Sequence, residues 1–131
     1  MRFPWFSTYA ELSEETVQLL IQLASDRGSM LYAWCIMPDH IHLLLQDTNI
    51  IDFVRLFKGK LVPKAAVLKQ DQRLWQRSFY DRGLRKEESL EQTAVYIWEN
   101  SLRAGLVAHA TEYPWSGSLV WPNWRDFVGK E

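Results

Sequence analysis

Cysteine and long apolar runs are what this sequence lacks. Its only cysteine, Cys35, excludes an internal disulfide and a zinc site built from several thiolates. A single thiol in an apolar stretch is typical of a small buried side chain in a reducing compartment. No apolar stretch approaches the roughly 18 residues that a membrane span requires, and the N-terminus lacks the apolar segment of a signal peptide. We therefore expect a cytoplasmic protein with no membrane partner.

The chain does have enough apolar material for one core. It has 131 residues, of which 47% are hydrophobic and 14% aromatic, including seven tryptophans. This length fits a single domain over residues 1–131, and the composition excludes a largely disordered chain. The sequence shows no repeat, low-complexity tract or linker, so we treat it as one folding unit.

Charge is nearly balanced overall but unevenly distributed. The formal net charge is -1, with 15 basic and 16 acidic residues. Residues 55–86 hold ten basic and two acidic residues, whereas the rest of the chain holds five basic and fourteen acidic ones. A basic segment on an acidic body indicates a site for a polyanion, although a solvated face with ordinary lysines would give the same pattern.

The first part of the chain predicts a helix followed by a β-hairpin. The helix is expected over residues 12–28, because Ser13 can cap its start and Gly28 can end it. Two strand-like runs follow, at 31–37 and 40–46, and the Pro-Asp pair between them is typical of a tight turn.

Two further helices are predicted after the hairpin. One begins near residue 50, capped by Thr48 or Asn49, and ends or kinks at Pro63. The other runs from Ser89, which has a glutamine three residues later as in a capping box, to Gly105, a residue suited to a helix C-terminus. This order suggests an α+β domain with helices over one face of an antiparallel sheet.

Two histidines interrupt the apolar second strand. Alternation along a strand places His40, His42 and Leu44 on one face. Ile41, Leu43 and Leu45 share the other face, which suits a helix-covered core. Two imidazoles on one face can converge on a cation. An isolated His-x-His is more often a pair of ordinary, hydrogen-bonded histidines, so a metal site needs a third ligand.

The last predicted helix offers such a ligand. Its 3.6-residue period places Gln92, Tyr96, Asn100 and Arg103 on one face. An asparagine carbonyl oxygen is a reasonable ligand for a hard cation, and a tyrosine hydroxyl beside it could attack a phosphorus atom held there. An ordinary amphipathic helix with a half-exposed tyrosine would show the same spacing.

Three ordered blocks of sequence resemble a known family. They read MPDHIHLLL at residues 37–45, LWQRSFYDRGLR at 74–85 and YIWENSLRAGLV at 96–107, and EYPWSGS follows at 112–118. The first block resembles the histidine signature of HUH single-strand nucleases. Together the blocks resemble the REP-associated tyrosine transposases, within the single-tyrosine HUH transposase family of insertion sequences, from about residue 12 to residue 118.

The resemblance implies a fold and a role for each matching residue. The expected fold is a ferredoxin-like antiparallel sheet with flanking helices. By resemblance, His40 and His42 hold a divalent metal, Tyr96 is the nucleophile and Asn100 completes the metal site. Members of the family cut single-stranded DNA near imperfect hairpins. The tyrosine joins a 5′ phosphate and leaves a free 3′ hydroxyl, after which the strand can be rejoined.

Cofactor and partners follow from the same resemblance. Imidazole ligands alone would favour zinc or another transition metal, whereas the family favours Mg2+ or Mn2+, which we expect here because an amide ligand suits a hard ion. The expected partner is single-stranded DNA with a hairpin. The protein is expected as a monomer or a homodimer, with the tyrosine helix serving its own subunit or exchanged between two.

Basic side chains are expected to follow the DNA phosphates, and aromatic ones can stack on unpaired bases. Trp75, Phe79 and Tyr80 are candidates for stacking, although Trp75 and Phe79 also suit a core. Tyr80 is the main rival of Tyr96 as nucleophile. The residues predicted to bind DNA are Arg55, Lys58, Lys60, Lys64, Arg73, Arg77, Arg82, Arg85 and Arg103.

The sequence is compatible with two other functions. The chain could be a non-catalytic nucleic-acid-binding domain of the same fold, decayed or domesticated, or a metal-dependent hydrolase in which water attacks and Tyr96 only lines the site. One departure from the family pattern is that Ser101, rather than proline, follows Asn100.

Overall fold

The computed structural model describes residues 4–68 and 89–129. Within these residues, three strands form one antiparallel sheet in the order β2-β1-β3. Two short 3-10 helices accompany the last strand, at Ala110–Glu112 and Trp124–Phe127. The remaining elements, in chain order, are α1 (Trp5–Thr8), α2 (Ala10–Arg27), β1 (Met30–Ile36), β2 (Ile41–Gln46), α3 (Ile50–Leu68), α4 (Leu90–Trp98), α5 (Asn100–Arg103) and β3 (Ser116–Gly117).

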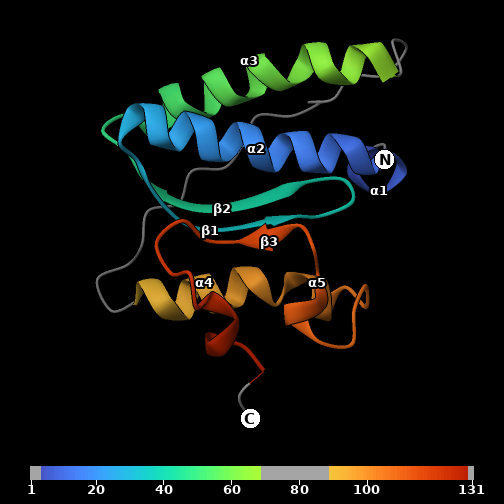
Figure 1. The fold of residues 1–131 in the computed structure, drawn as a ribbon, viewed down its shortest axis with the longest axis vertical. Coiled ribbons are helices and arrows are strands. Elements are labelled where there is room, and N and C mark those ends of the chain that lie inside the picture. The colour runs from blue at the N-terminus through green and yellow to red at the C-terminus, as the bar shows by residue number, and fades with distance from the viewer. Residues whose placement is uncertain (1–3, 69–88, 130–131) are drawn as a thin grey trace.

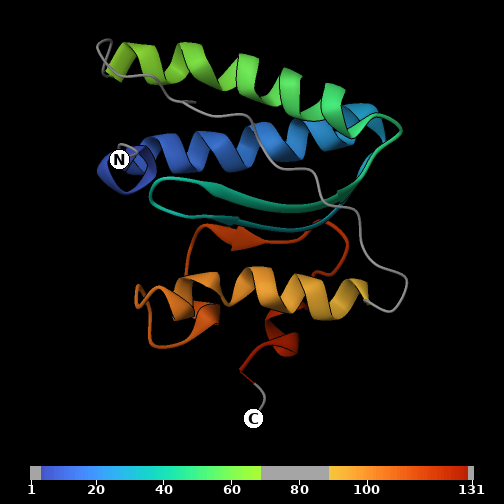
Figure 2. The same ribbon diagram turned by 180° about the vertical axis from the view of Figure 1, so that it is seen from behind.

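Helices cover both faces of the sheet. Figures 1 and 2 show α2 and α3 on one side of the strands and α4 with α5 on the other. The core is divided in the same way, since Trp34 and Ile36 of β1 pack with α2 and α3, whereas Ala33 and Cys35 pack with α4. The α+β class with an antiparallel sheet and flanking helices is therefore confirmed. The expectation that helices cover only one face was wrong, because alternate residues of β1 are buried on both sides.

The predicted hairpin is present with nearly the predicted bounds. The two strands pair antiparallel, with Cys35 opposite His42 and Ile36 opposite Ile41. The turn closes through the Met37 N–H, which donates to the His40 carbonyl at 2.8 Å. The turn is also tied to the N-terminal helix, because the Phe6 N–H donates to the Pro38 carbonyl at 2.9 Å. This second bond fixes the loop that carries the histidines.

Some of the helices begin and end at the capping and terminating residues that the sequence predicted, and others do not. Gly28 ends α2 in the left-handed conformation, with φ 66°, and Asn49 caps α3 by accepting from the Asp52 N–H at 3.0 Å. Ser13 is not a cap: α2 begins earlier, and the buried Ser13 hydroxyl donates to the Phe6 carbonyl at 3.0 Å. Helix α3 does not end at Pro63 but runs on to Leu68. Among the described helices, none is long and apolar enough to cross a membrane.

A charged cluster joins the end of α2 to the start of α3. The Asp47 side chain is 1% exposed and accepts from Arg27 Nη2 at 2.7 Å, from the Ser29 hydroxyl and from the Asn49 N–H at 2.8 Å. The Arg27 hydrogen bonds hold the pKa of the Asp47 carboxyl well below its ordinary value. The ion pair therefore stabilises the folded state only while Asp47 is ionised.

Asp47→Asn is expected to lower the free energy of unfolding by about 2–3 kcal/mol, because the half-buried Arg27 loses its bidentate carboxylate and keeps only the Asp52 ion pair. The lowered pKa of Asp47 sets the direction of the pH dependence. Its contribution is complete above about pH 4, the unfolded-state value, and is lost as pH falls below it. Urea unfolding at pH 7 and at pH 3 measures both effects. The exposed Asp126→Asn is the control, and an equal loss in the two variants at pH 7 would contradict the account.

A close approach of backbone to side chain fixes β3 against β1. A Cβ placed on Gly117 would lie 2.4 Å from Cζ2 of Trp34, and the Gly117 carbonyl accepts from Trp98 Nε1 at 2.9 Å. Gly59, by contrast, lies on the exposed side of α3 with open space around it.

Substitution by alanine is expected to change the stability of the protein in opposite directions at the two glycines. Gly117→Ala should destabilise the protein by about 1–3 kcal/mol, because the Trp34 ring has to move. Gly59→Ala should stabilise it by up to about 1 kcal/mol through helix propensity. Thermal unfolding of both variants measures the difference, and a raised Tm for Gly117→Ala would be inconsistent with the packing described.

Candidate functional site

The two histidine rings meet at the start of β2. Their Nε2 atoms are 3.0 Å apart, and the ring centroids are 4.8 Å apart with the planes nearly perpendicular. Both nitrogens therefore face the same small volume. Two imidazole nitrogens arranged in this way can share one proton, or both can give their lone pairs to one cation.

Asp39 determines which nitrogen of His40 is available. Its Oδ1 lies 2.6 Å from His40 Nδ1, and both side chains are about one third exposed, at 33% and 32%. The Nδ1–H of His40 donates a hydrogen bond to this carboxylate. The Nε2 atom then carries the lone pair, which points at His42. A carboxylate behind a histidine is the usual support of a metal ligand. From the sequence, Asp39 is expected only as a turn residue, although its place beside a candidate ligand is a usable signal.

The histidine pair lies on the sheet face that α4 covers. His42 pairs with Cys35, whose side chain packs with Ala94 and Trp98 of α4, and Leu44 packs in the same group. Ile41, Leu43 and Leu45 pack on the opposite face with α2 and α3. The predicted separation of the histidine face from the core face of β2 is confirmed.

Tyr96 stands on α4 with its side chain exposed. Ala94, Ile97 and Trp98 form the buried side of this helix, whereas Tyr96 is 61% exposed. The buried side is anchored by an aromatic group in which Trp98 contacts Trp124 with ring centroids 5.1 Å apart. A firmly packed helix thus presents a hydroxyl that a large substrate can reach.

Arg103 connects Tyr96 with Asn100. Its guanidinium carbon lies 3.8 Å from the centroid of the Tyr96 ring. Its Nη2 donates to the Tyr96 carbonyl at 2.6 Å and to Asn100 Oδ1 at 2.9 Å. The Asn100 amide donates in turn to the Ile97 carbonyl at 3.0 Å. The predicted nucleophile and the predicted amide ligand therefore belong to one hydrogen-bonded group.

The tyrosine helix is interrupted where the sequence predicts a continuous one. Helix α4 ends at Trp98, Glu99 is a turn and α5 begins at Asn100. Side chains bond the carbonyl groups around this turn, because Asn100 reaches Ile97 and Ser101 reaches Trp98. Ser101, fully buried, lies in the first turn of α5, a position that accepts the proline of the family pattern. Gly105 follows α5 with φ 74°, as expected of a helix end.

The other described tyrosines are poorer nucleophiles. Tyr113 is buried, its hydroxyl donates to the Ile36 carbonyl, and burial raises its pKa to about 12. The Tyr32 hydroxyl donates to Gln46 Oε1 at 3.2 Å on the sheet. Tyr9 packs against Trp5 at the N-terminus. Tyr80 lies outside the described residues.

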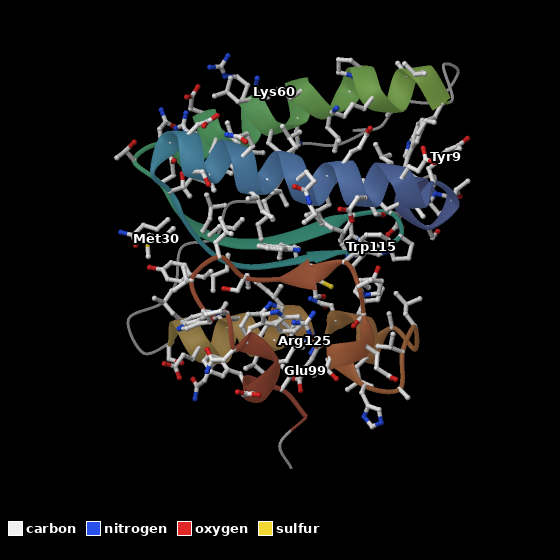
Figure 3. The ribbon with its side chains drawn as sticks, viewed as in Figure 1. Tyr9, Met30, Lys60, Glu99, Trp115 and Arg125 are labelled. Atoms are coloured by element: carbon white, nitrogen blue, oxygen red, sulfur yellow. The ribbon has the colours of Figure 1, made fainter. Side chains whose placement is uncertain are left out.

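The predicted DNA-binding residues do not gather at one place. Arg55, Lys58, Lys60 and Lys64 belong to α3, on the far side of the sheet from Tyr96, and Figure 3 shows Lys60 and Glu99 on opposite sides of the strands. Arg55 forms an ion pair with Asp52, and burial lowers the pKa of Lys58. Of the members of the predicted set that the structure describes, Arg103 is the one that lies beside Tyr96. The rest fall outside the described residues: Arg73, Arg77, Arg82 and Arg85, together with the stacking candidates Trp75 and Phe79.

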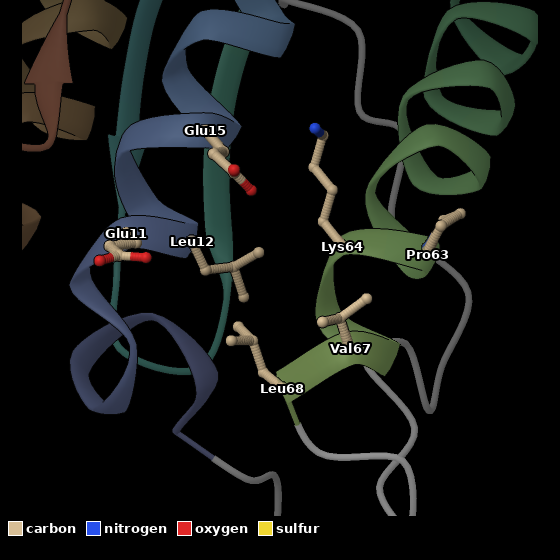
Figure 4. Close-up of a pocket in the computed structure, with 7 residues that line it drawn as sticks. All are labelled: Glu11, Leu12, Glu15, Pro63, Lys64, Val67 and Leu68. Atoms are coloured by element: carbon tan, nitrogen blue, oxygen red, sulfur yellow. The ribbon is translucent and has the colours of Figure 1, made fainter.

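A pocket between α2 and α3 lies away from these groups. Figure 4 shows Glu15 and Lys64 directed into the space between the two helices. The pocket is on the α2 and α3 side of the sheet, opposite Tyr96 and the histidine pair. We therefore do not assign it to the candidate site. Its lining consists of Glu11, Leu12, Glu15, Pro63, Lys64, Val67 and Leu68.

Within residues 4–68 and 89–129, no three His, Cys, Asp or Glu side chains are placed to hold one metal ion. The residues present nevertheless suit a divalent cation in part. Two convergent imidazole nitrogens with a supporting carboxylate form a ligand pair, and a third ligand would have to be an oxygen of another kind. Asn100 Oδ1 is a candidate, since a carbonyl oxygen has a second lone pair besides the one that accepts from Arg103.

Known transposases match more than half of this chain. The family model described as "Transposase IS200 like" matches residues 2–100. A putative REP-associated tyrosine transposase of Haemophilus influenzae is 31% identical, over 64% of this chain and 56% of that protein. The REP-associated tyrosine transposase of Escherichia coli is 26% identical, over 74% of this chain and 59% of that protein. The chain thus spans less than three fifths of the length of either relative.

A solved structure shares the fold. It is a REP-associated tyrosine transposase bound to a REP hairpin, and it matches with a TM-score of 0.68 at 22% sequence identity. The match covers 88% of this chain and 68% of that one. At this identity the likeness extends to the arrangement of helices and strands, which agrees with the ferredoxin-like expectation.

Proposed function

The chain belongs to the family of IS200-like transposases, and from this premise we propose that it cuts and rejoins single-stranded DNA near hairpins. The reaction would pass through a covalent bond between Tyr96 and a 5′ phosphate. The observation that carries the proposal is the position of Tyr96. It is an exposed tyrosine, linked through Arg103 to Asn100, on the helix that covers the face of the histidine pair.

The cleavage step requires few groups. The Tyr96 oxygen attacks the phosphorus, a bond forms between them, and the bond from phosphorus to the 3′ oxygen breaks. The tyrosine proton is lost and the departing 3′ oxygen gains one, so the products are a 5′-phosphotyrosine and a free 3′ hydroxyl. Rejoining is the reverse reaction with the same or another 3′ hydroxyl. The new bond from phosphorus to tyrosine replaces the bond to the 3′ oxygen and retains its energy, so rejoining needs no nucleotide cofactor.

His40 and His42 would hold a divalent cation, Mg2+ or Mn2+, with Asn100 as a further ligand. When bound, the cation would polarise the phosphodiester and offset the charge that develops on its oxygens. Asp39 would keep His40 in the tautomer that binds metal. Tyr96 would be held by Arg103 and by the anchored helix while the substrate approaches.

The proposed substrate is an unpaired strand beside a hairpin. The hairpin stem would bind through its phosphates to basic side chains, and the bases of the unpaired strand would stack on aromatic ones. The described α3 lysines are on the other side of the sheet from Tyr96, so a DNA long enough to reach both would have to pass around the sheet edge. A REP-like hairpin is the first substrate to try, since the structural relative binds a REP hairpin.

The test is incubation with a labelled hairpin carrying unpaired flanks, with Mn2+ or Mg2+, followed by a denaturing gel. The proposal expects a protein–DNA band that survives denaturation and is absent with a chelator. Cleavage without such a band would favour the hydrolase in which water attacks. Binding without cleavage, across several hairpins and both metals, would favour the non-catalytic DNA-binding domain.

A further inference from the structure

We propose that Arg103 is a positioning residue, which holds the Tyr96 ring and the Asn100 amide in one orientation before DNA binds. The proposal rests on the function assigned above to Tyr96 and refines it. It differs from the role that the sequence suggested for Arg103, which was contact with the DNA backbone.

The contacts of the guanidinium are with residues that precede it, in α4, in the turn at Glu99 and in α5. One nitrogen, Nη2, donates hydrogen bonds to the Tyr96 carbonyl at 2.6 Å and to Asn100 Oδ1 at 2.9 Å. The other terminal nitrogen lies 4.0 Å from the Glu99 carboxylate. Both Nη2 hydrogens are thus used within residues 96–100, and the plane of the group is fixed by two bonds.

The same plane covers the tyrosine ring. The guanidinium carbon is 3.8 Å from the ring centroid, within the range of a cation–π contact. A ring that is 61% exposed gains little restraint from packing and would otherwise populate several rotamers. Arg103 therefore selects a rotamer of Tyr96 and at the same time fixes the carbonyl oxygen of Asn100.

The contact spans the turn between the end of α4 and the start of α5. Arg103 is seven residues after Tyr96, about two helical turns, which is too far for a neighbouring pair on a continuous helix. The Arg103 side chain extends back across the turn at Glu99, and its Nη2 donates to the Tyr96 carbonyl. Lysine at this position has neither the planar face nor the paired donors, so it should not replace arginine.

The decisive experiment measures the Tyr96 side chain without DNA or metal. Three-bond couplings across χ1 in the Tyr96 spectrum should report one rotamer in the unmodified protein and averaged values in Arg103→Lys and Arg103→Gln. Arg125→Gln is the matched control, because Arg125 covers another aromatic ring, that of Trp124, at 4.7 Å. Averaged couplings in the unmodified protein, or a single rotamer retained in both variants, would overturn the proposal whatever the activity.

The second measurement separates positioning from DNA contact. Single-turnover cleavage at saturating hairpin should slow by about 10- to 100-fold in Arg103→Lys, while the Kd for the hairpin changes less than about threefold. A weaker Kd with an unchanged saturated rate would assign Arg103 to the DNA backbone instead. If the unmodified protein forms no adduct, the proposed function fails, and the couplings still decide the role of Arg103.

Discussion

Tyr96→Phe is expected to abolish the covalent protein–DNA adduct and to lower the cleavage rate by at least about three orders of magnitude. Phenylalanine keeps the ring over which the Arg103 guanidinium lies and removes only the hydroxyl. The helix should be unaffected, because the packed side of α4 is formed by other residues. Loss of a covalent nucleophile typically removes most of the rate enhancement of an enzyme that depends on it.

The measurement is a time course of adduct and cleaved strand with one labelled hairpin. Tyr32→Phe is the matched control, since the Tyr32 hydroxyl bonds to Gln46 on the sheet and is not part of the site. Both variants should unfold at nearly the temperature of the unmodified protein. Full cleavage by Tyr96→Phe would instead support attack by water or by another tyrosine, with Tyr80 as the first to examine.

Replacing either ring of the histidine pair is expected to weaken Mn2+ binding by at least about 100-fold and to stop cleavage. The two Nε2 atoms are 3.0 Å apart and can bind the same cation. Removing either histidine leaves one imidazole ligand instead of two. Asp39→Asn should have the smaller effect of about 10- to 100-fold, which is typical of the group behind a ligand. His40→Ala, His42→Ala and Asp39→Asn therefore form a graded series.

Titration of Mn2+ followed by its paramagnetic resonance spectrum measures this series directly, without DNA. The exposed His109→Ala is the control and should bind Mn2+ as the unmodified protein does. Equal affinity in His40→Ala and His109→Ala would contradict the assignment of the pair. Cleavage that then remained metal-dependent would require a different metal site.

Elements governed by local signals were predicted well. The hairpin follows from alternation and its Pro-Asp turn, and Gly28, Asn49 and Ser89 mark helix ends as expected. The start of α2 was not predicted, because burial of Trp5 and Phe6 at the N-terminus is a long-range effect. The second covering layer was missed for a similar reason: β1 is an apolar run buried on both faces, and periodicity alone does not reveal which helices cover them.

In the candidate site, too, the features set by local spacing were predicted and those set by longer-range contacts were not. Placing His40 with His42, and Tyr96 with Asn100, required only strand and helix periods. The break at Glu99 depends on side chains that bond the helix carbonyls, and propensity gives little sign of it. Spacing alone predicted that Arg103 and Tyr96 share a face, but not that the guanidinium lies over the tyrosine ring. The support of His40 by Asp39 required the geometry of the turn.

Mapping the DNA-linked peptide would identify the nucleophile itself. After cleavage of the hairpin, the adduct would be digested with nuclease and trypsin and examined by mass spectrometry. The sequence suits this test, because tryptic cleavage after Lys86 and Arg103 yields residues 87–103, in which Tyr96 is the only tyrosine. We expect a nucleotide phosphate on this peptide, at Tyr96. The same modification on the peptide that carries Tyr80, with residues 87–103 unmodified, would contradict it.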